Sequence, residues 1–269
     1  MANRRVAKLA RRLLIGAVIA YLAIVAALFF AQRSLIYPAP QQFHDPAPGF
    51  ATATLTTTDD LALQAHWREP DAGRPTIAYF HGNGGSLALA AQETQGYAAR
   101  GYGVLLVEYR GYGGNPGAPS EQGLYRDGHA AMAFLAARNI TPAQTIIVGH
   151  SLGTGTATEM ARQVSPAALI LLAPFTSVPD AAAHAMPFVP ARWLVRDRFD
   201  NRAKLPALAT PVLIVHGTAD SVVPFDLGQQ LAEATPGATF RAVPGADHMI
   251  SLDPAVQAAQ LAWLSAQGL

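Results

Sequence analysis

Hydrophobic and polar positions follow three successive patterns along the chain. Residues 13–31 form one unbroken apolar run, LLIGAVIAYLAIVAALFFA. Residues 51–57 and 61–67 then alternate apolar and polar positions on either side of Asp59 and Asp60, which predicts an antiparallel hairpin. From residue 76 onward, short continuous apolar runs are separated by longer helix-like segments. The chain therefore divides into an apolar N-terminal segment and a domain of alternating elements.

The short apolar runs are typical of parallel strands that are buried on both faces of a sheet. They cover residues 76–80, 104–107, 145–148, 168–172, 212–215 and 239–243. Helix-like segments separate them at residues 87–100, 121–138, 152–164, 225–234 and 254–266. Strands that alternate with helices predict an α/β fold with a mostly parallel central sheet and helices on both faces.

One connection between strands is unusually long. About 40 residues separate the apolar run that ends at 172 from the one that begins at 212, too many for an ordinary loop. We expect a small helical cap there, at about 175–206, over the carboxyl edge of the sheet. Its large apolar side chains either pack internally or line a substrate site; they are Phe188, Trp193, Leu194 and Phe199. Its arginines, at 192, 196 and 198, either face anionic head groups or form a solvated surface.

The apolar run at 13–31 is long enough to cross a membrane. At about 1.5 Å per residue, a helix over this run spans roughly 28 Å, close to the thickness of a bilayer core. Basic residues precede it at 4, 5, 8, 11 and 12, and Arg33 follows it. The positive-inside rule then predicts a basic cytoplasmic N-terminus at 1–12 and a catalytic domain on the other side, which in a bacterium is the periplasmic face of the inner membrane.

Two other interpretations of this run are weaker. A cleaved signal peptide would need small residues near the end of the run, where Phe29 and Phe30 lie instead. A buried core helix would leave one face polar, and this run has no polar face. We therefore expect a retained signal anchor at 13–31, a proline-punctuated linker at 32–50 and a folded domain at 51–269.

Composition narrows the chemistry of that domain. The 269 residues carry a formal net charge of +1, are 51% hydrophobic and include no cysteine. Disulfides, thiolate metal sites, a cysteine nucleophile and an acylated-cysteine anchor are therefore excluded. The basic cluster lies beside the apolar run, which indicates membrane topology, and we expect no nucleic-acid binding.

The pentapeptide Gly149-His150-Ser151-Leu152-Gly153 is the strongest chemical signal. It follows the apolar strand TIIV and precedes a helix-like segment, which is the strand–turn–helix context of a nucleophile elbow. A turn this sharp strains the serine backbone and leaves no space for side chains at the flanking glycines. Ser151 is therefore the predicted nucleophile.

A serine nucleophile needs a base, and the base needs an acid to orient it. In this strand–turn–helix arrangement the acid and then the histidine follow the serine along the chain. Asp220 ends the segment VLIVHGTAD after one strand, and His248 ends PGADH after the next. We therefore predict Asp220 as the acid and His248 as the base.

Other histidines and acids near strand ends are weaker candidates. His81 and His216 precede the acid in the chain, so we interpret them as loop-ordering or packing residues, and His150 should point away from Ser151. Asp247 adjoins His248 and cannot easily reach its ring, whereas Asp226 lies in the next helix-like segment.

The segment FHGNGG at 80–85 follows the first long parallel strand. A glycine-rich turn in this position lets backbone amides approach a developing oxyanion, and the best candidates are the amides of Asn83 and Leu152. A phosphate-binding loop is the weaker interpretation, because the segment has neither the Walker lysine nor the G-x-G-x-x-G spacing. The sequence has no H-E-x-x-H motif or clustered His and Asp ligands, so we expect no metal and no cofactor.

Several motifs together resemble the Bem46-like branch of the α/β hydrolases. They are EYRGYGGNPG at 108–117, HGNGG, GHSLG, APFTS at 173–177, HGTADSVVP, and the LIYP that follows the apolar run. The branch includes membrane-associated lipid hydrolases and protein depalmitoylases of the ABHD12, ABHD13 and ABHD17 type, so the resemblance implies the same triad, oxyanion residues and α/β-hydrolase fold. Glu108 stands where relatives often have aspartate, and we expect no catalytic consequence.

These observations predict a serine hydrolase that transfers acyl groups from carboxylic esters or thioesters to water, with apolar or lipid-like acyl substrates. Its expected partners are a small-molecule acyl ester or lipid, and the membrane through the N-terminal helix. A peptidase of the same fold would need a larger cap or an added domain. A non-catalytic membrane scaffold would not require all three residues of the triad.

Overall fold

The apolar run folds as part of a single long helix. In a computed structural model that describes residues 2–269, helix α1 spans Ala2–Ile36. It extends beyond the predicted 13–31 at both ends, through the basic residues and into the segment expected as a linker. The first proline of the chain is Pro38, so no proline interrupts the helix before that point. Pro38 disfavours a helical backbone at the preceding residue, Tyr37, and the helix therefore ends at Ile36.

The central sheet has eight strands in the order β1-β2-β4-β3-β5-β6-β7-β8. The strands are β1 (Ala51–Thr56), β2 (Ala62–Arg68), β3 (Thr76–Phe80), β4 (Gly103–Val107), β5 (Thr145–His150), β6 (Ala168–Leu172), β7 (Val212–Gly217) and β8 (Thr239–Val243). Strand β2 pairs antiparallel with both β1 and β4, and every other pair is parallel. The predicted hairpin and the predicted mostly parallel sheet are confirmed.

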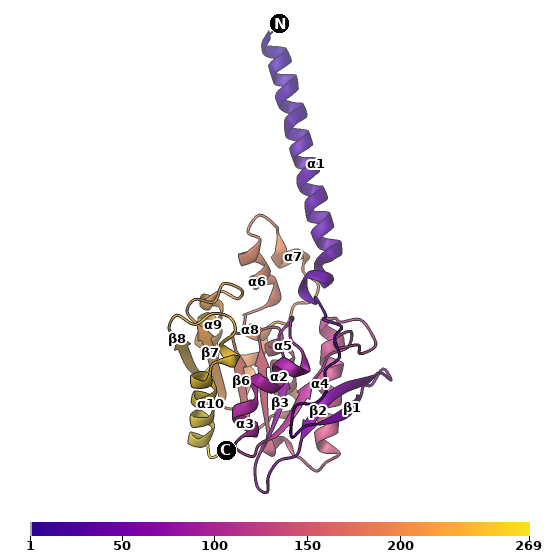
Figure 1. Ribbon diagram of the computed structural model, residues 1–269. Coiled ribbons are helices and arrows are strands. Elements are labelled where there is room, and N and C mark those ends of the chain that lie inside the picture. The colour runs from indigo at the N-terminus through magenta and orange to yellow at the C-terminus, as the bar shows by residue number, and fades with distance from the viewer. Residues whose placement is uncertain (1) are drawn as a thin grey trace.

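Helices cover both faces of this sheet, as the alternation of elements predicts (Figure 1). Helices α4 (Glu121–Ala136), α5 (Gly153–Val164) and α9 (Phe225–Glu233) pack in one apolar cluster. Helices α2 (Leu87–Glu93), α3 (Gln95–Ala98) and α10 (Pro254–Ala266) pack in the other. The single helix expected at 87–100 is divided at Thr94, whose hydroxyl donates to the carbonyl of Ala90 at 2.7 Å. Three 3-10 turns complete the fold, at Pro142–Gln144, Leu205–Ala207 and Ile250–Leu252.

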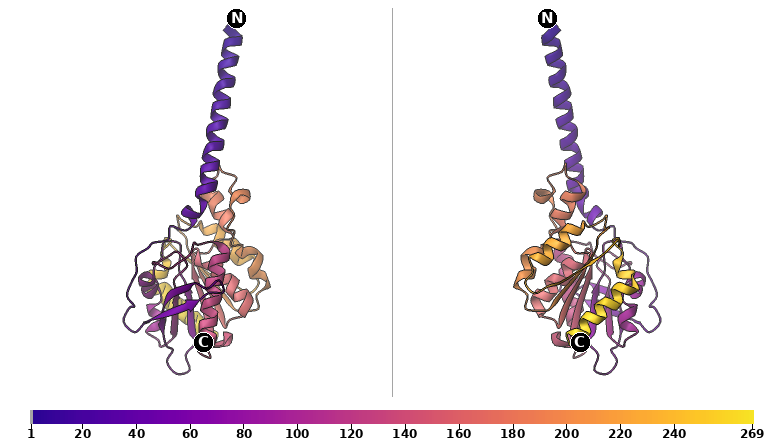
Figure 2. Two further views of the ribbon diagram at one scale, coloured as in Figure 1. Left: turned by 90° about the vertical axis from the view of Figure 1, so that its right-hand side faces the viewer. Right: turned by 90° about the vertical axis from the view of Figure 1, so that its left-hand side faces the viewer.

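The long connection after β6 forms three short helices, α6 (Val178–Ala185), α7 (Ala191–Leu194) and α8 (Asn201–Lys204). Helices α6 and α7 lie at the end of the domain from which α1 projects (Figures 1 and 2). The four large apolar side chains of this segment have different surroundings. Phe199 is fully buried against Tyr125, with ring centroids 5.6 Å apart, whereas Trp193 is 89% exposed.

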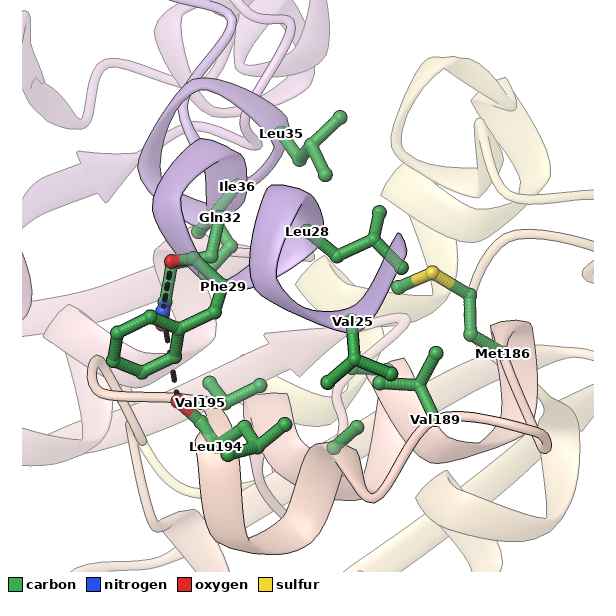
Figure 3. A pocket seen from close by; sticks show the side chains of 12 residues that line it. Val25, Leu28, Phe29, Gln32, Leu35, Ile36, Met186, Val189, Leu194 and Val195 are labelled. Atoms are coloured by element: carbon green, nitrogen blue, oxygen red, sulfur yellow. Dashed lines mark hydrogen bonds between the residues drawn. The ribbon is translucent and has the colours of Figure 1, made fainter. Parts of the chain in front are cut away.

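Helix α1 packs directly against this segment, along a seam shown in Figure 3. The Gln32 side chain donates to the carbonyl of Leu194 at 3.5 Å and accepts from the amide of Arg196 at 2.8 Å. Arg33 forms an ion pair with the buried Asp197 at 3.3 Å. These contacts explain why residues 32–36 are helical although their sequence was read as linker.

The remaining linker residues lie on the surface of the domain. Tyr37 is buried, and the amide of Gly113 donates to the carbonyl of Pro40 at 2.8 Å. The Gln41 side chain donates to the carbonyl of Gly111 at 2.6 Å. The segment expected as an extended linker is therefore fixed to the domain by several contacts.

Candidate active site

The turn between β5 and α5 holds Ser151 in a strained backbone conformation with φ of +50°. A side chain at Gly153 would collide with the main-chain oxygen of Phe80. A Cβ at Gly149 would lie 2.7 Å from the Cβ of Ala157. Both glycines are therefore required by close packing, and the turn presents Ser151 at the carboxyl end of the sheet.

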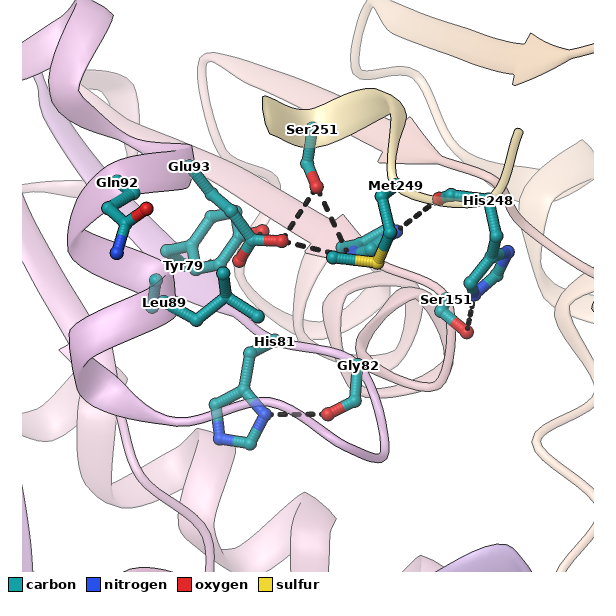
Figure 4. Close-up of polar contacts among 12 residues, drawn as sticks. Tyr79, His81, Gly82, Leu89, Gln92, Glu93, Ser151, His248, Met249 and Ser251 are labelled. Carbon is teal, nitrogen blue, oxygen red and sulfur yellow. Dashed lines mark hydrogen bonds and ion pairs between the residues drawn. The ribbon is translucent and has the colours of Figure 1, made fainter. Parts of the chain in front are cut away.

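Three predicted side chains meet at this edge of the sheet. The Nε2 of His248 lies 2.9 Å from the Oγ of Ser151, as Figure 4 shows. The Nδ1 of the same ring lies 2.8 Å from Oδ2 of Asp220. The three residues come from loops after β5, β7 and β8, which end at the same edge of the sheet. Serine hydroxyl, imidazole and carboxylate thus form one continuous chain of hydrogen bonds.

Asp220 is held in its ionised form by several donors. Its Oδ1 accepts from the amides of Val222 and Val223 at 2.9 and 2.8 Å. Burial raises the pKa of this carboxyl, but hydrogen bonds from His216 and His248 lower it more, so the pKa of Asp220 lies below its usual range. A carboxylate in this state keeps the Nδ1 proton on His248 and leaves Nε2 free to accept one from Ser151.

His216 contacts the acid, a role that sequence reasoning missed. Its Nε2 lies 3.3 Å from Oδ2 of Asp220 and 3.0 Å from the carbonyl of Val223. We interpreted this histidine as a loop-ordering or packing residue, and it does both while also donating to the carboxylate. Its position, four residues before Asp220 at a strand end, is the signal that could have identified it.

The glycine-rich turn after β3 passes beside the serine. A Cβ at Gly82 would lie 3.3 Å from the Cβ of Ser151. Within residues 2–269, the main-chain amides of Asn83 and Leu152 donate to no protein acceptor. A hollow opens here, lined by Gly82–Gly85, Leu89, Glu93, His150, Ser151, His248 and Met249. Two unused backbone donors beside a serine hydroxyl are what a developing oxyanion requires.

None of the large apolar side chains of the 175–206 segment lines this hollow. Phe199 contributes to the core beside Gly155, and Trp193 faces outward. The sequence left open whether Phe188, Trp193, Leu194 and Phe199 pack internally or line the substrate site. Phe199 packs internally, and none of the four lines the hollow at Ser151.

A buried polar network lies beside the loop of His248, and the sequence did not predict it (Figure 4). The Nε2 of His150 lies 3.0 Å from the carbonyl of His248, and its Nδ1 lies 3.2 Å from Glu93. Ser251 and Tyr79 donate to the same Glu93 carboxylate at 2.6 and 2.8 Å. Burial would lower the pKa of His150, but its bond to Glu93 and the negative charge there raise it overall, while the pKa of Glu93 is lowered. The two groups form an internal ion pair that holds the backbone of the His248 loop.

This ion pair should give the stability of the protein a distinctive pH dependence. The raised pKa of His150 contributes stability below its ordinary value of 6.5, and that contribution is lost as the pH rises through the raised value. The lowered pKa of Glu93 contributes above its ordinary 4.5 and is lost on acidification. Both contributions are complete between these values, so Glu93→Gln should destabilise most there, by about 3 kcal/mol, and less at pH 9.

Urea unfolding of the detergent-solubilised chain at pH 5.5 and pH 9 measures this difference. The exposed Glu233 in α9 gives a matched control, and Glu233→Gln should have little effect at either pH. A Glu93→Gln effect of equal size at both pH values would contradict the ion-pair assignment.

The other weaker candidates have partners of their own. His81 is buried and lies 2.7 Å from Glu108, which also accepts from the amide of Leu87 at 3.3 Å. Asp247 accepts from the amide of Met249 at 2.9 Å. Asp226 lies 3.7 Å from His184. None of these contacts includes Ser151.

Comparison with known proteins gives relatives along most of the chain. The profile of a family described as alpha/beta hydrolase fold matches residues 75–198. An uncharacterized protein of Mycobacterium tuberculosis, Rv2307c, is 34% identical over 252 residues, which are 90% of this chain and 89% of the relative. The lysophosphatidylserine lipase ABHD12 of Danio rerio is 35% identical over 192 residues, 63% of this chain but 50% of the relative, so the chain spans about half its length.

Solved structures show the same fold at low sequence identity. The Pyrococcus furiosus esterase Pf2001 matches with a TM-score of 0.69 and 15% identity, covering 86% of this chain and 97% of the esterase. A thermophilic esterase from Thermogutta terrifontis matches with a TM-score of 0.62 and 17% identity, covering 81% of this chain and 99% of the esterase.

Proposed function

Because this chain belongs to the α/β-hydrolase family, in an ABHD12-like branch, we propose that it is a serine hydrolase that cleaves carboxylic ester or thioester bonds. The observation that carries the proposal is the continuous hydrogen-bond chain from Ser151 through His248 to Asp220, with distances of 2.9 and 2.8 Å. Such a chain activates a hydroxyl that is otherwise a weak nucleophile at neutral pH.

In the first half of the reaction, the Oγ of Ser151 attacks the acyl carbonyl as the Nε2 of His248 takes its proton. Asp220 stabilises the imidazolium that forms. The amides of Asn83 and Leu152 stabilise the negative oxygen of the tetrahedral intermediate. The imidazolium then gives its proton to the leaving alcohol or thiol, and an acyl-enzyme remains.

In the second half, His248 removes a proton from water, and the resulting hydroxide attacks the acyl-enzyme. The same two amides stabilise the second tetrahedral intermediate. Its collapse returns the proton to Ser151 and releases a carboxylic acid. The reaction needs only water as co-substrate, and every proton passes through the imidazole ring.

We propose apolar acyl or lipid-like esters as the substrate class. The relatives named as lysophosphatidylserine lipases act on a lipid, and they match this chain at about 34–35% identity. The hollow at Ser151 adds apolar walls from Leu89 and Met249 to the polar groups of the catalytic residues. A lipid substrate also suits a protein with one helix, Arg4–Ile36, long and apolar enough to cross a membrane.

The proposed topology is a single membrane crossing by residues 13–31 of α1. The five basic residues before this stretch support a cytoplasmic N-terminus, residues 1–12. Residues 51–269, with the cap at about 175–206, would then form the catalytic domain on the non-cytoplasmic side. The exposed apolar surface of α1, which includes Leu14, Ile19 and Leu22, supports contact with lipid rather than with the domain.

A fluorophosphonate probe and a series of p-nitrophenyl esters test this function together. We expect the probe to label Ser151, because only an activated serine reacts with it. The exposed Ser265 on α10 gives the matched control: Ser265→Ala should keep the labelling that Ser151→Ala abolishes. Each added methylene of the acyl chain should raise kcat/KM by up to about fourfold until the site is filled.

Three results would contradict parts of the proposal. A folded protein that no fluorophosphonate labels would be a scaffold that has kept the fold without the activity. Labelling that persists in Ser151→Ala would place the reactive serine elsewhere. A kcat/KM that stays constant from acetate to longer esters would remove the lipid-like substrate class and leave a general esterase.

A further inference from the structure

The hairpin formed by α6 and α7 lies beside the C-terminal part of the apolar stretch of α1. The hydroxyl of Tyr21 donates to the carbonyl of Phe188 at 2.9 Å, and Phe188 lies in the turn between α6 and α7. Tyr21 is ten residues before Ala31, where the apolar stretch ends, so the two positions are about 15 Å apart along the helix. The tip of the hairpin therefore lies beside the middle of the apolar stretch, about 15 Å from the end at Ala31.

The contacts between α1 and the hairpin change character along the helix axis. Val25 and Leu28 of α1 face Met186 and Val189 near the hairpin tip, and Phe29 lies beside Leu194 and Val195 (Figure 3). Farther down, Gln32 and Arg33 meet the polar backbone and side chains of residues 194–197. Contacts near the hairpin tip are therefore apolar alone, whereas from Gln32 onward polar contacts are added to the apolar ones of Leu35 and Ile36. A membrane boundary near Gln32 would produce this change.

Two basic side chains of this segment make their contacts away from the hairpin tip. Arg192 in α7 forms an ion pair at 3.0 Å with Asp180 in the first turn of α6, away from the hairpin tip. The guanidinium of Arg196 lies 4.4 Å from the ring centroid of Phe29, which is two residues before Ala31. Long basic side chains at a membrane interface are placed in this way, with their charge directed toward water or head groups.

Most of the large apolar side chains exposed outside α1 lie at the same end of the molecule. In the described chain there are five, and all but Phe43 belong to the hairpin or to loops at the carboxyl edge of the sheet: Phe188, Trp193, Val222 and Met249. Phe188 and Trp193 belong to the hairpin, with 60% and 89% of their surfaces exposed. Val222 and Met249 adjoin Asp220 and His248, at the carboxyl edge of the sheet. An apolar surface concentrated around the base of a membrane helix suits a bilayer better than water.

The seam between α1 and the hairpin is too narrow to be a ligand pocket itself. Its free volume is about 60 Å³, whereas ligand sites usually offer about 300–1,000 Å³. The two elements are therefore packed against each other, and it is the outer surface of the hairpin that remains available to lipid.

We propose that the α6–α7 hairpin is inserted into the bilayer leaflet adjoining the catalytic domain, so that α1 and the hairpin form one membrane-embedded unit. Phe188 then lies among acyl chains, and Trp193 lies near the head groups, where tryptophan side chains are favoured. The hollow at Ser151, at the same end of the domain, faces the membrane surface. This inference rests on the proposed membrane crossing of α1.

Single-cysteine labelling tests the insertion, because the chain contains no cysteine of its own. A polarity-sensitive fluorophore is placed on Phe188→Cys, Trp193→Cys, Leu22→Cys or Ser265→Cys in the full chain. Each variant is reconstituted into phosphatidylcholine vesicles with and without nitroxide-labelled lipids. We expect nitroxides deep in the acyl chains to quench the labels at 188 and 22, and nitroxides near the head groups to quench the label at 193. The label at 265, at the opposite end of the domain, should be unaffected.

The outcomes separate the two proposals. Quenching at 22 but not at 188 or 193 would overturn hairpin insertion while leaving the membrane crossing intact. Absence of quenching at all four positions would reject the crossing and the insertion together. Hydrolysis of p-nitrophenyl acetate by the labelled proteins reports the proposed activity separately from either.

A second measurement tests the consequence for catalysis. The double variant Phe188→Asp and Trp193→Asp should lower the rate on a long-chain ester embedded in vesicles by about tenfold, because charges are costly inside the acyl-chain region. Its rate on soluble p-nitrophenyl acetate should stay within about twofold, since neither residue lines the hollow. Phe43→Asp, an exposed aromatic outside the hairpin, is the matched control and should change neither rate. Equal losses on both substrates would contradict the proposal.

Discussion

Ser151→Ala is expected to lower kcat for ester hydrolysis by about a million-fold while the protein remains folded. In the proposed reaction this hydroxyl forms the acyl-enzyme. Alanine removes it without disturbing the turn, because Ser151 keeps its φ of +50° through the packing of the flanking glycines. Single-turnover and steady-state hydrolysis of a p-nitrophenyl ester would measure the loss. Circular dichroism would confirm that the fold is retained.

His248→Ala should cost nearly as much, and the double variant little more than either single one. Ser151 and His248 act together in one step, so once either side chain is lost, removing the other lowers kcat very little further. Two separate losses that multiply in the double variant would show that Ser151 and His248 act independently. The matched control is His129→Ala in α4, a histidine of the same type outside the hydrogen-bond chain, which should keep nearly full activity.

Asp220→Asn should lower kcat by about ten-thousand-fold. An amide in this position can donate its NH2 to the Nδ1 of His248, which favours the imidazole tautomer whose Nε2 already carries a proton and cannot accept one from Ser151. His216 retains its contact with the carbonyl of Val223, so the loop should stay in place. The substitution should therefore change which nitrogen of His248 carries the proton and leave the fold intact. Measuring kcat together with the thermal unfolding temperature separates these two effects.

The same variant should alter the acid stability of the protein. Because the pKa of Asp220 is lowered in the folded state, its contribution to stability is complete above its ordinary pKa of 3.8 and is lost on acidification through the folded value. Asp220→Asn removes this contribution, so its stability should fall less steeply than that of the natural protein as the pH is lowered below 5. An unchanged acid profile would indicate that Asp220 carries no charge in the folded protein.

Much of the fold could be predicted from the sequence because buried parallel strands leave a strong local pattern. The run TIIV before Ser151 can only be accommodated as a fully buried strand, and β5 lies in the middle of the sheet. Ser151, Asp220 and His248 each follow a predicted parallel strand. Because parallel strands end at one edge of a sheet, their positions in the chain predicted that the three side chains lie close together. The division of the predicted helix at Thr94 was not predicted, because one threonine lowers the helix propensity of a segment only slightly.

The contacts that sequence reasoning missed join side chains that are distant along the chain. Glu93 at the end of α2 is 57 residues from His150 at the end of β5, and only the tertiary fold brings the two side chains together. Phe188 and Tyr21 are separated by 167 residues. Residues 32–36 also differ from the sequence expectation of an extended linker, because they continue helix α1 and pack against the cap. Such pairings depend on tertiary position, which local periodicity does not encode.

The contacts of residues 37–50 set the working distance of the active site. A free linker of this length would allow excursions of about 20 Å, enough to present Ser151 to a neighbouring membrane as easily as to its own. Here Tyr37 is buried and Pro40 and Gln41 are bonded to the 111–113 turn, so that freedom is absent. The position of Ser151 relative to α1 is therefore fixed when the chain folds. If α1 crosses a membrane as proposed, Ser151 reaches only substrates in the membrane that holds its own helix.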